Sequence, residues 1–371
     1  MIKERNKLDY ISALRGIAII LVMMVHTSSY DGNQNVILSS FFKFGAKGVQ
    51  LFFLASAFTL FLSYNYRSKQ ESNFKINFYI RRFFRIAPMY YLGITYYQWQ
   101  QQNFAISNSV SDVWNIIANI FFVHGLSPYW INNLVPGGWS ITVEIFFYAL
   151  VPFLFTRIKN LDGAVKFTLV TFFLSMSFRV FLAKFVMIEN TILWGEFSYY
   201  NFITQLPAFG MGIIAYFLII KKDFYITPVN SLLVFVVIMA HFIWGRIIPN
   251  FLLIGGGFLF LLYILSRKEY KIFVNRVTLF FGKISYSAYL VHFAVLFWIN
   301  KIKLIKFLNS NSFKDIFLIN YALRFLILIF CTSIIAFFFY NVIEVPFQRL
   351  GKKIITDRNK LKKSKPIKSE V

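Results

Sequence analysis

Long apolar segments recur from one end of the chain to the other, and short polar or basic connections separate them. A membrane-spanning helix needs about 20 mostly apolar residues. Segments near that length occupy residues 10–29, 46–64, 86–99, 112–126, 139–156, 165–187, 202–220, 228–245, 249–266, 279–300 and 316–342. No soluble domain of ordinary size fits between them. The pattern predicts an all-α fold, a polytopic membrane helix bundle.

Composition and charge support a membrane location. The 371 residues are 58% hydrophobic and 20% aromatic, with a mean hydropathy of +0.60, which exceeds what one soluble core can bury. A formal net charge of +24 would also fit a nucleic-acid partner. The basic residues, however, lie between the apolar segments and in the C-terminal tail, so membrane orientation and anionic lipid account for them better. We expect the lipid bilayer as a partner and no nucleic acid.

The basic clusters predict which side each connection faces, because lysine and arginine concentrate on the cytoplasmic side. They lie at the N-terminus, at residues 67–85, 157–166, 221–222 and 267–276, and in the tail. Each interval between clusters should hold an even number of spans, but the interval from 85 to 157 holds three segments. Since 86–99 and 112–126 are short, we expect one of these two to be re-entrant or interfacial. About ten transmembrane helices result, with both termini cytoplasmic and lysines 301–314 outside, against the rule.

The chain divides into a membrane domain, residues 1–346, and a basic cytoplasmic tail, residues 347–371, which we predict to be disordered. The basic N-terminus followed by an apolar run resembles a secretory signal, but Arg15 interrupts the run and no small-x-small cleavage site follows. We interpret it as an uncleaved first span. Cys331 is the only cysteine, so the sequence offers neither a disulfide nor a cysteine metal cluster, and no metal is expected.

Ionisable residues inside apolar spans are costly in lipid and are therefore candidate functional residues. Arg15 and His26 share the first span, eleven residues and about 16 Å of helical rise apart. With the N-terminus inside, Arg15 lies in the inner half and His26 near the outer surface, where a histidine can act as a general base. The alternative is that Arg15 snorkels to headgroups and His26 is an interfacial residue bonded to a loop.

Three arginines and a glutamate are further candidates. Arg81, Arg82 and Arg85 carry guanidinium groups that suit phosphate oxygens, such as those of a nucleotide-bearing donor, although juxtamembrane arginines also set topology. Glu144 begins another span, with Tyr148 one turn beyond it on the same face. That carboxylate can accept a proton or orient an imidazole, or it can be a hydrogen-bond partner between helices.

A late polar stripe completes the candidates. Ser285, Tyr289 and His292 share one helical face, where they can line a site or join packed helices, and Ser140 precedes Glu144 by one turn. Glu344, before Pro346, is interpreted as structural. Four other ionisable residues in or near apolar runs have no partner at helical spacing and stay unassigned: His124, His241, Arg179 and Arg324.

Taken in order, these residues resemble the acyltransferase-3 family of membrane O-acyltransferases from about Leu8 to Pro346. The matching motifs are Leu14-Arg15-Gly16-Ile17-Ala18 with His26, Gly48-Val49-Gln50-Leu51-Phe52-Phe53 with Ser56-Ala57-Phe58, Arg82-Phe83-Phe84-Arg85, Trp139-Ser140 with Glu144 and Tyr148, and Ser285-Tyr286 with Tyr289 and His292. The chain departs from the family at Ser12-Ala13, where many members carry Asp-Gly, and at Ala57, where glycine is usual. These departures remove none of the proposed catalytic groups, but the first span lacks the acidic residue that many members carry.

The resemblance implies that Arg15 and His26 take part in acyl transfer and that Arg82 and Arg85 meet a CoA donor. It further implies transfer of acetyl from cytoplasmic acetyl-CoA to a hydroxyl of an extracytoplasmic or lipid-linked glycan, most simply O-antigen or another surface polysaccharide, by an enzyme of the bacterial inner membrane. Some relatives add an extracytoplasmic hydrolase-like domain, so this chain acts alone or passes the acyl group to a separate periplasmic partner. The alternatives are a glycan transporter or flippase, and a glycan polymerase, which would be expected to carry a large outer loop.

Overall fold

The computed structural model describes residues 8–28, 42–71, 73–104, 113–227, 229–230, 233–234, 250–301 and 317–363. Its long helices are α2 (Asp9–Ser28), α4 (Gly48–Arg67), α5 (Phe74–Phe104), α7 (Gly138–Arg157), α8 (Leu161–Lys184), α9 (Thr191–Tyr200), α10 (Phe202–Tyr216), α12 (Asn250–Arg267), α13 (Arg276–Lys301), α15 (Phe317–Phe339) and α16 (Val345–Lys363). Shorter elements are α6 (Val113–Ile120), the 3₁₀ turns η2 (Gly45–Lys47) and η3 (His124–Leu126), and the π-helical turns η4 (Phe217–Lys221) and η6 (Tyr340–Glu344). The part of the chain covered by these ranges contains no β-strand.

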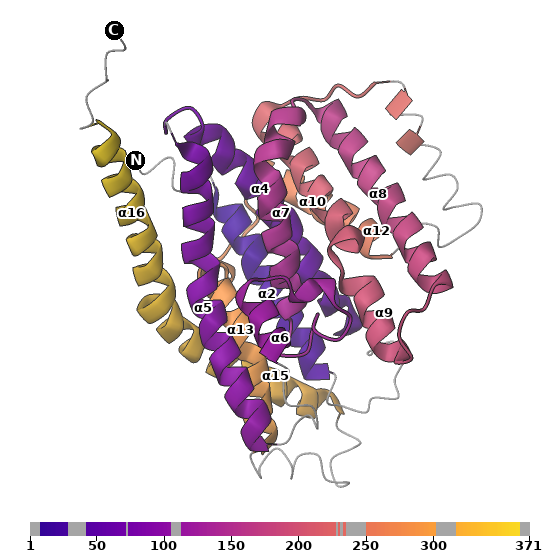
Figure 1. The fold of residues 1–371 in the computed structure, drawn as a ribbon, viewed down its shortest axis with the longest axis vertical. Helices are drawn as coiled ribbons and strands as arrows, with labels where there is room; N and C mark the ends of the chain where they lie inside the picture. Colours follow the sequence, from indigo (N-terminus) through magenta and orange to yellow (C-terminus); the bar gives the residue numbers. More distant parts are fainter. Residues whose placement is uncertain are drawn as a thin grey trace.

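The predicted all-α polytopic membrane bundle is confirmed. Seven helical stretches in the described ranges are long and apolar enough to cross a membrane: Asp9–Ser28, Phe42–Arg67, Gly138–Arg157, Leu161–Lys184, Thr191–Lys221, Arg276–Lys301 and Asn320–Lys360. These stretches lie side by side in one bundle, which also includes α5 and α12 (Figure 1). Most of the predicted span 228–245, including His241, falls outside the described residues, as do the lysines at 303, 306 and 314.

The ambiguous interval between the second and third basic clusters now has a clear form. Residues 86–99 belong to α5, whose 31 residues rise about 46 Å and are long enough to cross a membrane. Residues 112–126 contain the eight-residue α6 and the turn η3, which are too short to cross. The connections from α4 to α5 and from α7 to α8, which carry basic clusters, lie at the same upper end of the bundle (Figure 1). The segment 112–126 is therefore the one that does not span.

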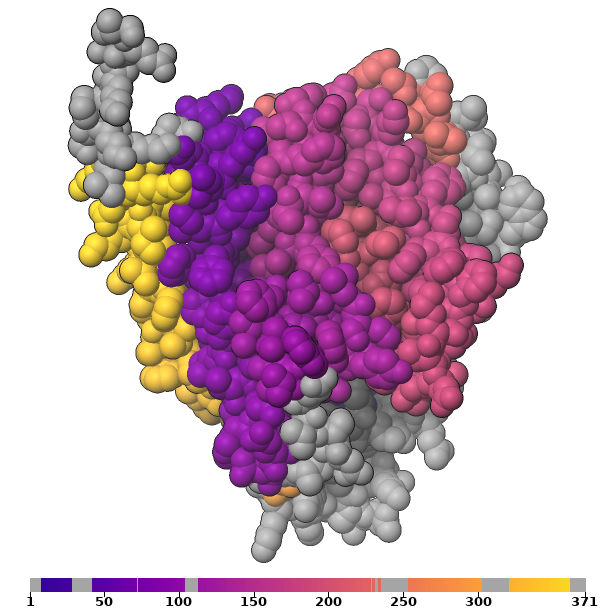
Figure 2. Space-filling model, viewed as in Figure 1, coloured from indigo at the N-terminus to yellow at the C-terminus, as the bar shows by residue number. Residues whose placement is uncertain are grey.

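The basic tail differs from the prediction, because helix α16 continues to Lys363. It follows α15 through the π-helical turn η6 and lies on the surface against α5 (Figure 2). Gly351 lets this helix approach Phe84 closely, since a Cβ there would lie 2.9 Å from the Phe84 side chain, and Ile355 is buried. The predicted disorder is thus wrong for residues 347–363, which are helical, with Gly351 and Ile355 at buried positions.

Two glycines allow α2 and α13 to touch backbone to backbone. A Cβ on Gly16 would lie 1.9 Å from the carbonyl oxygen of Thr278, and a Cβ on Gly282 would lie 1.9 Å from the carbonyl oxygen of Ser12. Small residues at such crossings let membrane helices pack closely without hydrophobic driving force from water. The two helices run in the same direction, because His26 and His292, ten residues beyond the two glycines, also lie beside each other.

We predict that Gly282→Ala destabilises the bundle, because the added methyl must displace the backbone of α2. Overpacking of this kind costs about 1–3 kcal/mol, which is measurable as a lower Tm of the detergent-purified protein. Gly256→Ala on α12 is the matched control, because a Cβ added there has no described atom outside its own stretch of helix within 4 Å. Equal Tm values for the two variants would contradict the proposed backbone contact.

Candidate active site

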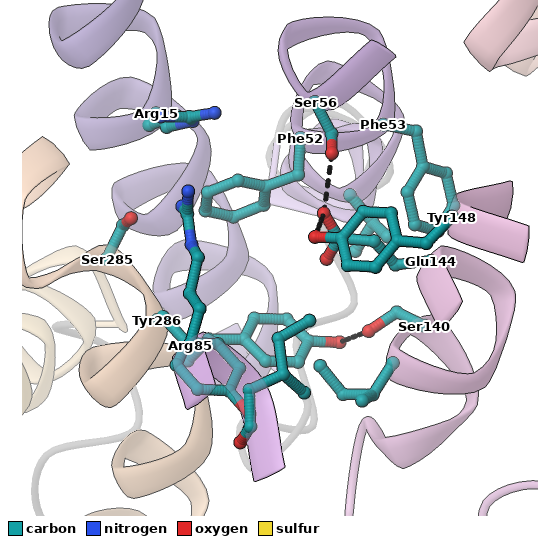
Figure 3. Close-up of a pocket in the computed structure, with 14 residues that line it drawn as sticks. Arg15, Phe52, Phe53, Ser56, Arg85, Ser140, Glu144, Tyr148, Ser285 and Tyr286 are labelled. Atoms are coloured by element: carbon teal, nitrogen blue, oxygen red, sulfur yellow. Dashed lines mark hydrogen bonds between the residues drawn. The ribbon is translucent and has the colours of Figure 1, made fainter. Parts of the chain in front are cut away.

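A small cavity with several polar side chains in its lining lies within the bundle among α2, α4, α5, α7 and α13, with a volume of about 60 Å³. Figure 3 shows the side chains that line it. Seven of the residues singled out by sequence line this cavity together: Arg15, Arg85, Ser140, Glu144, Tyr148, Ser285 and Tyr289. They come from four different helices, so it is packing of the helices, and not spacing along one helix, that brings them together.

The cavity carries two guanidinium groups on one side. Arg15 donates from Nη2 to Thr59 Oγ1 at 2.8 Å, and Arg85 extends toward the same space (Figure 3). Among the described residues, the ion pairs join Glu71 to Arg67 and Arg81. Neither Arg15 nor Arg85 therefore has a carboxylate partner within 4.0 Å in this part of the chain. Two cations facing one partly enclosed space favour binding of an anion.

Glu144 provides the only carboxylate among the lining residues, across the cavity from the arginines (Figure 3). Its Oε1 accepts hydrogen bonds from Ser56 Oγ and from Tyr148 OH, both at 2.6 Å. Two short bonds to one oxygen fix the orientation of the carboxylate. Sequence reasoning identified Glu144 and Tyr148 as site residues. It noted Ser56 only as part of a family motif, and it missed Thr59, whose only signal is a polar side chain inside an apolar span.

The three candidate arginines of α5 have different environments. Arg85 lines the cavity, whereas Arg82 lies over the rings of Phe78 and Tyr148, 5.6 and 5.7 Å from their centroids. Arg81 points elsewhere and forms a salt bridge with Glu71 at 3.0 Å. Successive residues of an α-helix are rotated by about 100°, so neighbouring arginines cannot all face one cavity.

The first turn of α7 is tied to α13 beneath the cavity. Tyr289 OH donates to the Gly137 carbonyl at 3.0 Å, and Ser140 Oγ lies 2.8 Å from the same hydroxyl. Gly137 has a φ of +78°, and a Cβ there would meet Tyr289 OH at 2.8 Å, so both the turn and the contact require glycine. Ser140 and Tyr289 therefore shape the cavity wall and hold it in place.

His124 supports this turn from below, a role that the sequence left unassigned. Its ring contacts Thr142 Oγ1 at 2.8 Å, the Gly138 carbonyl at 3.1 Å and Tyr90 OH at 3.2 Å. The side chain is buried, and burial lowers the pKa of His124 from 6.5 to about 4, so the imidazole is neutral at physiological pH. Its contacts indicate a structural residue that joins η3 to α7.

Two consecutive residues of α13 fix its neighbours. Tyr286, which lines the cavity, donates through its hydroxyl to the carbonyl of Ile86 at 2.7 Å, directly beside Arg85. Both the backbone N–H and the hydroxyl of Ser287 donate to Oε1 of the buried Glu344. Ser285, one residue earlier, lines the cavity and donates to the Gly282 carbonyl at 3.0 Å. Residues 285–287 of α13 therefore contribute both to the cavity wall and to the packing of α13 against α5 and η6.

His26 and His292 do not line the cavity. Their ring centroids lie 5.4 Å apart, and both rings pack on Phe293, at 4.3 and 4.1 Å. His26 is half-buried and His292 is fully buried. Glu144 bonds instead to Ser56 and Tyr148, so the structure does not bring Glu144 to His26. The two histidines form a separate pair, about 15 Å along α2 from Gly16.

Comparison with known proteins places the chain among acyltransferases. A family model described as "Acyltransferase domain" matches residues 8–341. A "Putative O-acetyltransferase" of Staphylococcus aureus strain COL is 26% identical over 95% of this chain and 60% of its own length, and a homologue in strain MRSA252 is 26% identical over 96% and 60%. A "Putative acetyltransferase" of Acidianus two-tailed virus is 24% identical over 78% of this chain and 83% of its own.

The chain thus spans about 60% of the length of the staphylococcal relatives. No solved structure matches it. Among the described residues, no group of three or more His, Cys, Asp or Glu side chains is arranged to hold a metal ion.

We predict that acid loosens the start of α5 through Glu71, which lies between α4 and α5. Although burial opposes its ionisation, hydrogen bonds from Asn77, Arg81 and Arg67 hold the pKa of Glu71 below its usual 4.5. Its stabilising contribution is therefore present above about pH 4.5 and is lost as the pH falls through the lowered pKa. Tm of purified wild type and Glu71→Gln, measured from about pH 6 to pH 3, should converge as the pH falls. Curves that stay parallel would contradict this assignment.

Proposed function

We propose, from the premise that the chain belongs to the acyltransferase family whose model matches residues 8–341, that it is a membrane O-acetyltransferase. It moves an acetyl group from acetyl-CoA, bound from the cytoplasmic side, to a hydroxyl of an extracytoplasmic or lipid-linked glycan. O-antigen or another surface polysaccharide is the proposed acceptor, and the bacterial inner membrane is the proposed location. The names of the relatives, which include O-acetyltransferase, support the chemistry in general terms.

The observation that carries the proposal is the pair of guanidinium groups, Arg15 and Arg85, that share one cavity without a carboxylate partner among the described residues. Uncompensated charge inside a membrane bundle is costly unless a ligand balances it. A phosphate-bearing donor supplies the opposite charge, and arginine forks match phosphate oxygens in pairs. We assign Arg85 to the donor phosphates, with Arg82 in support through its stacking on Tyr148.

The positions along the bundle fit a donor that enters from the cytoplasmic end. The connections that carry the basic clusters lie at the upper end in Figure 1, which is cytoplasmic by the distribution of lysine and arginine. Arg15 lies nearer that end than His26, and the two are separated by about 16 Å of helical rise. The linear pantetheine arm of CoA can cover this interval, so its thioester can reach His26 while its phosphates stay at the arginines.

The proposed reaction uses His26 as general base. The acceptor hydroxyl oxygen attacks the thioester carbonyl carbon while its proton passes to a nitrogen of His26. The C–S bond then breaks, the thiolate takes that proton, and the products are the acetyl ester and free CoA thiol. A two-step route, in which His26 is acetylated first and then donates the acetyl group, gives the same products. A separate extracytoplasmic partner is compatible with the second route.

Glu144 is proposed to act in the cavity and not on His26. Its fixed carboxylate, bonded to Ser56 and Tyr148, stands across the cavity from Arg15 and Arg85. There it can orient the two guanidinium groups through space and can receive polar groups of the donor. Ser140, Ser285 and Tyr289 complete the wall as supporting residues.

We predict that Arg85→Gln raises KM for acetyl-CoA at least about tenfold, the equivalent of ~1.4 kcal/mol, because a charge-assisted contact to phosphate is lost. Arg81→Gln removes the same charge from the same helix but from outside the cavity, so its KM should change by less than about twofold. Initial rates of acetyl transfer in membranes, at matched expression, give both values. A larger effect at Arg81 than at Arg85 would show that the donor binds elsewhere.

We further predict that His26→Ala abolishes transfer of radiolabelled acetyl from acetyl-CoA to surface polysaccharide while donor binding persists. Loss of a general base costs about 10²- to 10⁴-fold in rate. Wild-type membranes and a known acetyltransferase provide the two positive controls. Equal labelling by wild type and His26→Ala would remove His26 from the mechanism. If wild type fails where the known enzyme labels, a glycan transporter becomes the better assignment.

A further inference from the structure

The pairing of His26 with His292 follows from the geometry of the crossing between α2 and α13. Gly16 and Gly282 touch at the crossing, and each histidine lies ten residues further along its own helix. Because the helices run in the same direction, both histidines rise about 15 Å from that point and reach the same level. Their ring centroids are 5.4 Å apart with an angle of 38° between the ring planes. At this centroid separation, nitrogens on facing edges of the two rings can come within hydrogen-bond distance.

His292 is a fully buried imidazole with one nitrogen unsatisfied. Its Nδ1 lies 3.2 Å from the carbonyl oxygen of Ala288, and because that oxygen can only accept, Nδ1 carries the proton. In a neutral imidazole Nε2 is then a lone-pair acceptor. This Nε2 has no hydrogen-bond partner among the described residues, although the side chain has no exposed surface. A buried polar atom without a partner is rare and calls for an explanation.

We propose that His292 is the positioning residue of His26, accepting a hydrogen bond at its Nε2 from a ring N–H of His26. The bond holds His26 in one tautomer, with the opposite ring nitrogen unprotonated and available to the acceptor hydroxyl. Catalytic bases are commonly oriented by a third group in this way, and such bonds are often long until substrate binds. The inference rests on the proposed role of His26 as base.

The histidine pair also accounts for the transferred proton at each step of the reaction. When the hydroxyl proton passes to His26, the ring becomes an imidazolium whose second N–H points at the lone pair of His292. The positive charge is stabilised until His26 returns the proton to the leaving thiolate, and His292 keeps its own Nδ1 proton throughout. Glu144 cannot serve this role in the observed arrangement, because its contacts are Ser56 and Tyr148.

The test compares His292→Gln with His292→Met, two side chains of nearly equal length and flexibility. Glutamine offers an amide oxygen that can accept from His26, whereas methionine offers no comparable acceptor. We expect His292→Met to lower kcat by about a hundredfold and His292→Gln to retain at least about a tenth of wild-type kcat. KM for acetyl-CoA should stay within about twofold in both, because neither contacts the donor phosphates.

Tm of the purified variants and the His26→Ala variant provide the controls. Equal kcat for His292→Gln and His292→Met would overturn the proposal, because a residue that only packs would not distinguish the amide from the thioether. A change in KM without a change in kcat would also overturn it. If His26→Ala abolishes transfer while both His292 variants match wild type, the proposed function stands and this inference fails. If wild type itself transfers no acetyl where a known enzyme does, the proposed function fails, and the inference fails with it.

Discussion

The contact on which the rest of the site depends is the backbone crossing of α2 and α13 at Gly16 and Gly282. Neither glycine can accept a Cβ without moving the other helix. The crossing places Arg15, the neighbour of Gly16, opposite the polar face of α13, and it brings His26 and His292 to one level further along both helices. One close approach of two backbones therefore sets both the cavity and the histidine pair, which lie at different depths in the bundle.

The distribution of charge inside the bundle gives these two regions different chemistry. The cavity is cationic, because two arginines face one fixed carboxylate, whereas both rings of the histidine pair pack on Phe293. A cationic cavity suits the binding of a phosphate-bearing donor. A histidine pair suits proton transfer, because one imidazole can take up a proton while the other orients it. Separation of the two regions along α2 suits a long donor that is bound at one end and reacts at the other.

Much of the architecture could be predicted from the sequence, because hydropathy and basic clusters report directly on membrane spans and their orientation. The candidate residues were identifiable as rare ionisable groups in apolar segments. Their grouping was not, because contacts between helices depend on rotation and crossing. Sequence alone allowed Glu144 to orient an imidazole, which the structure does not bring to it. It also treated Arg81 like Arg85 and gave His124 no role. The helix in the lysine-rich tail was missed because its composition is polar and a lysine-rich run is typical of a solvated tail.

The central claim is that one donor molecule extends from the arginines of the cavity to the histidine pair. The most direct measurement is a structure of the full chain in lipid with a non-hydrolysable analogue of acetyl-CoA. The account predicts the phosphates beside Arg85 and the acyl carbon about 3.5 Å from a ring nitrogen of His26. An analogue bound instead in the apolar groove among α5, α13 and α15, which Leu92, Val295 and Ile335 help to line, would contradict it.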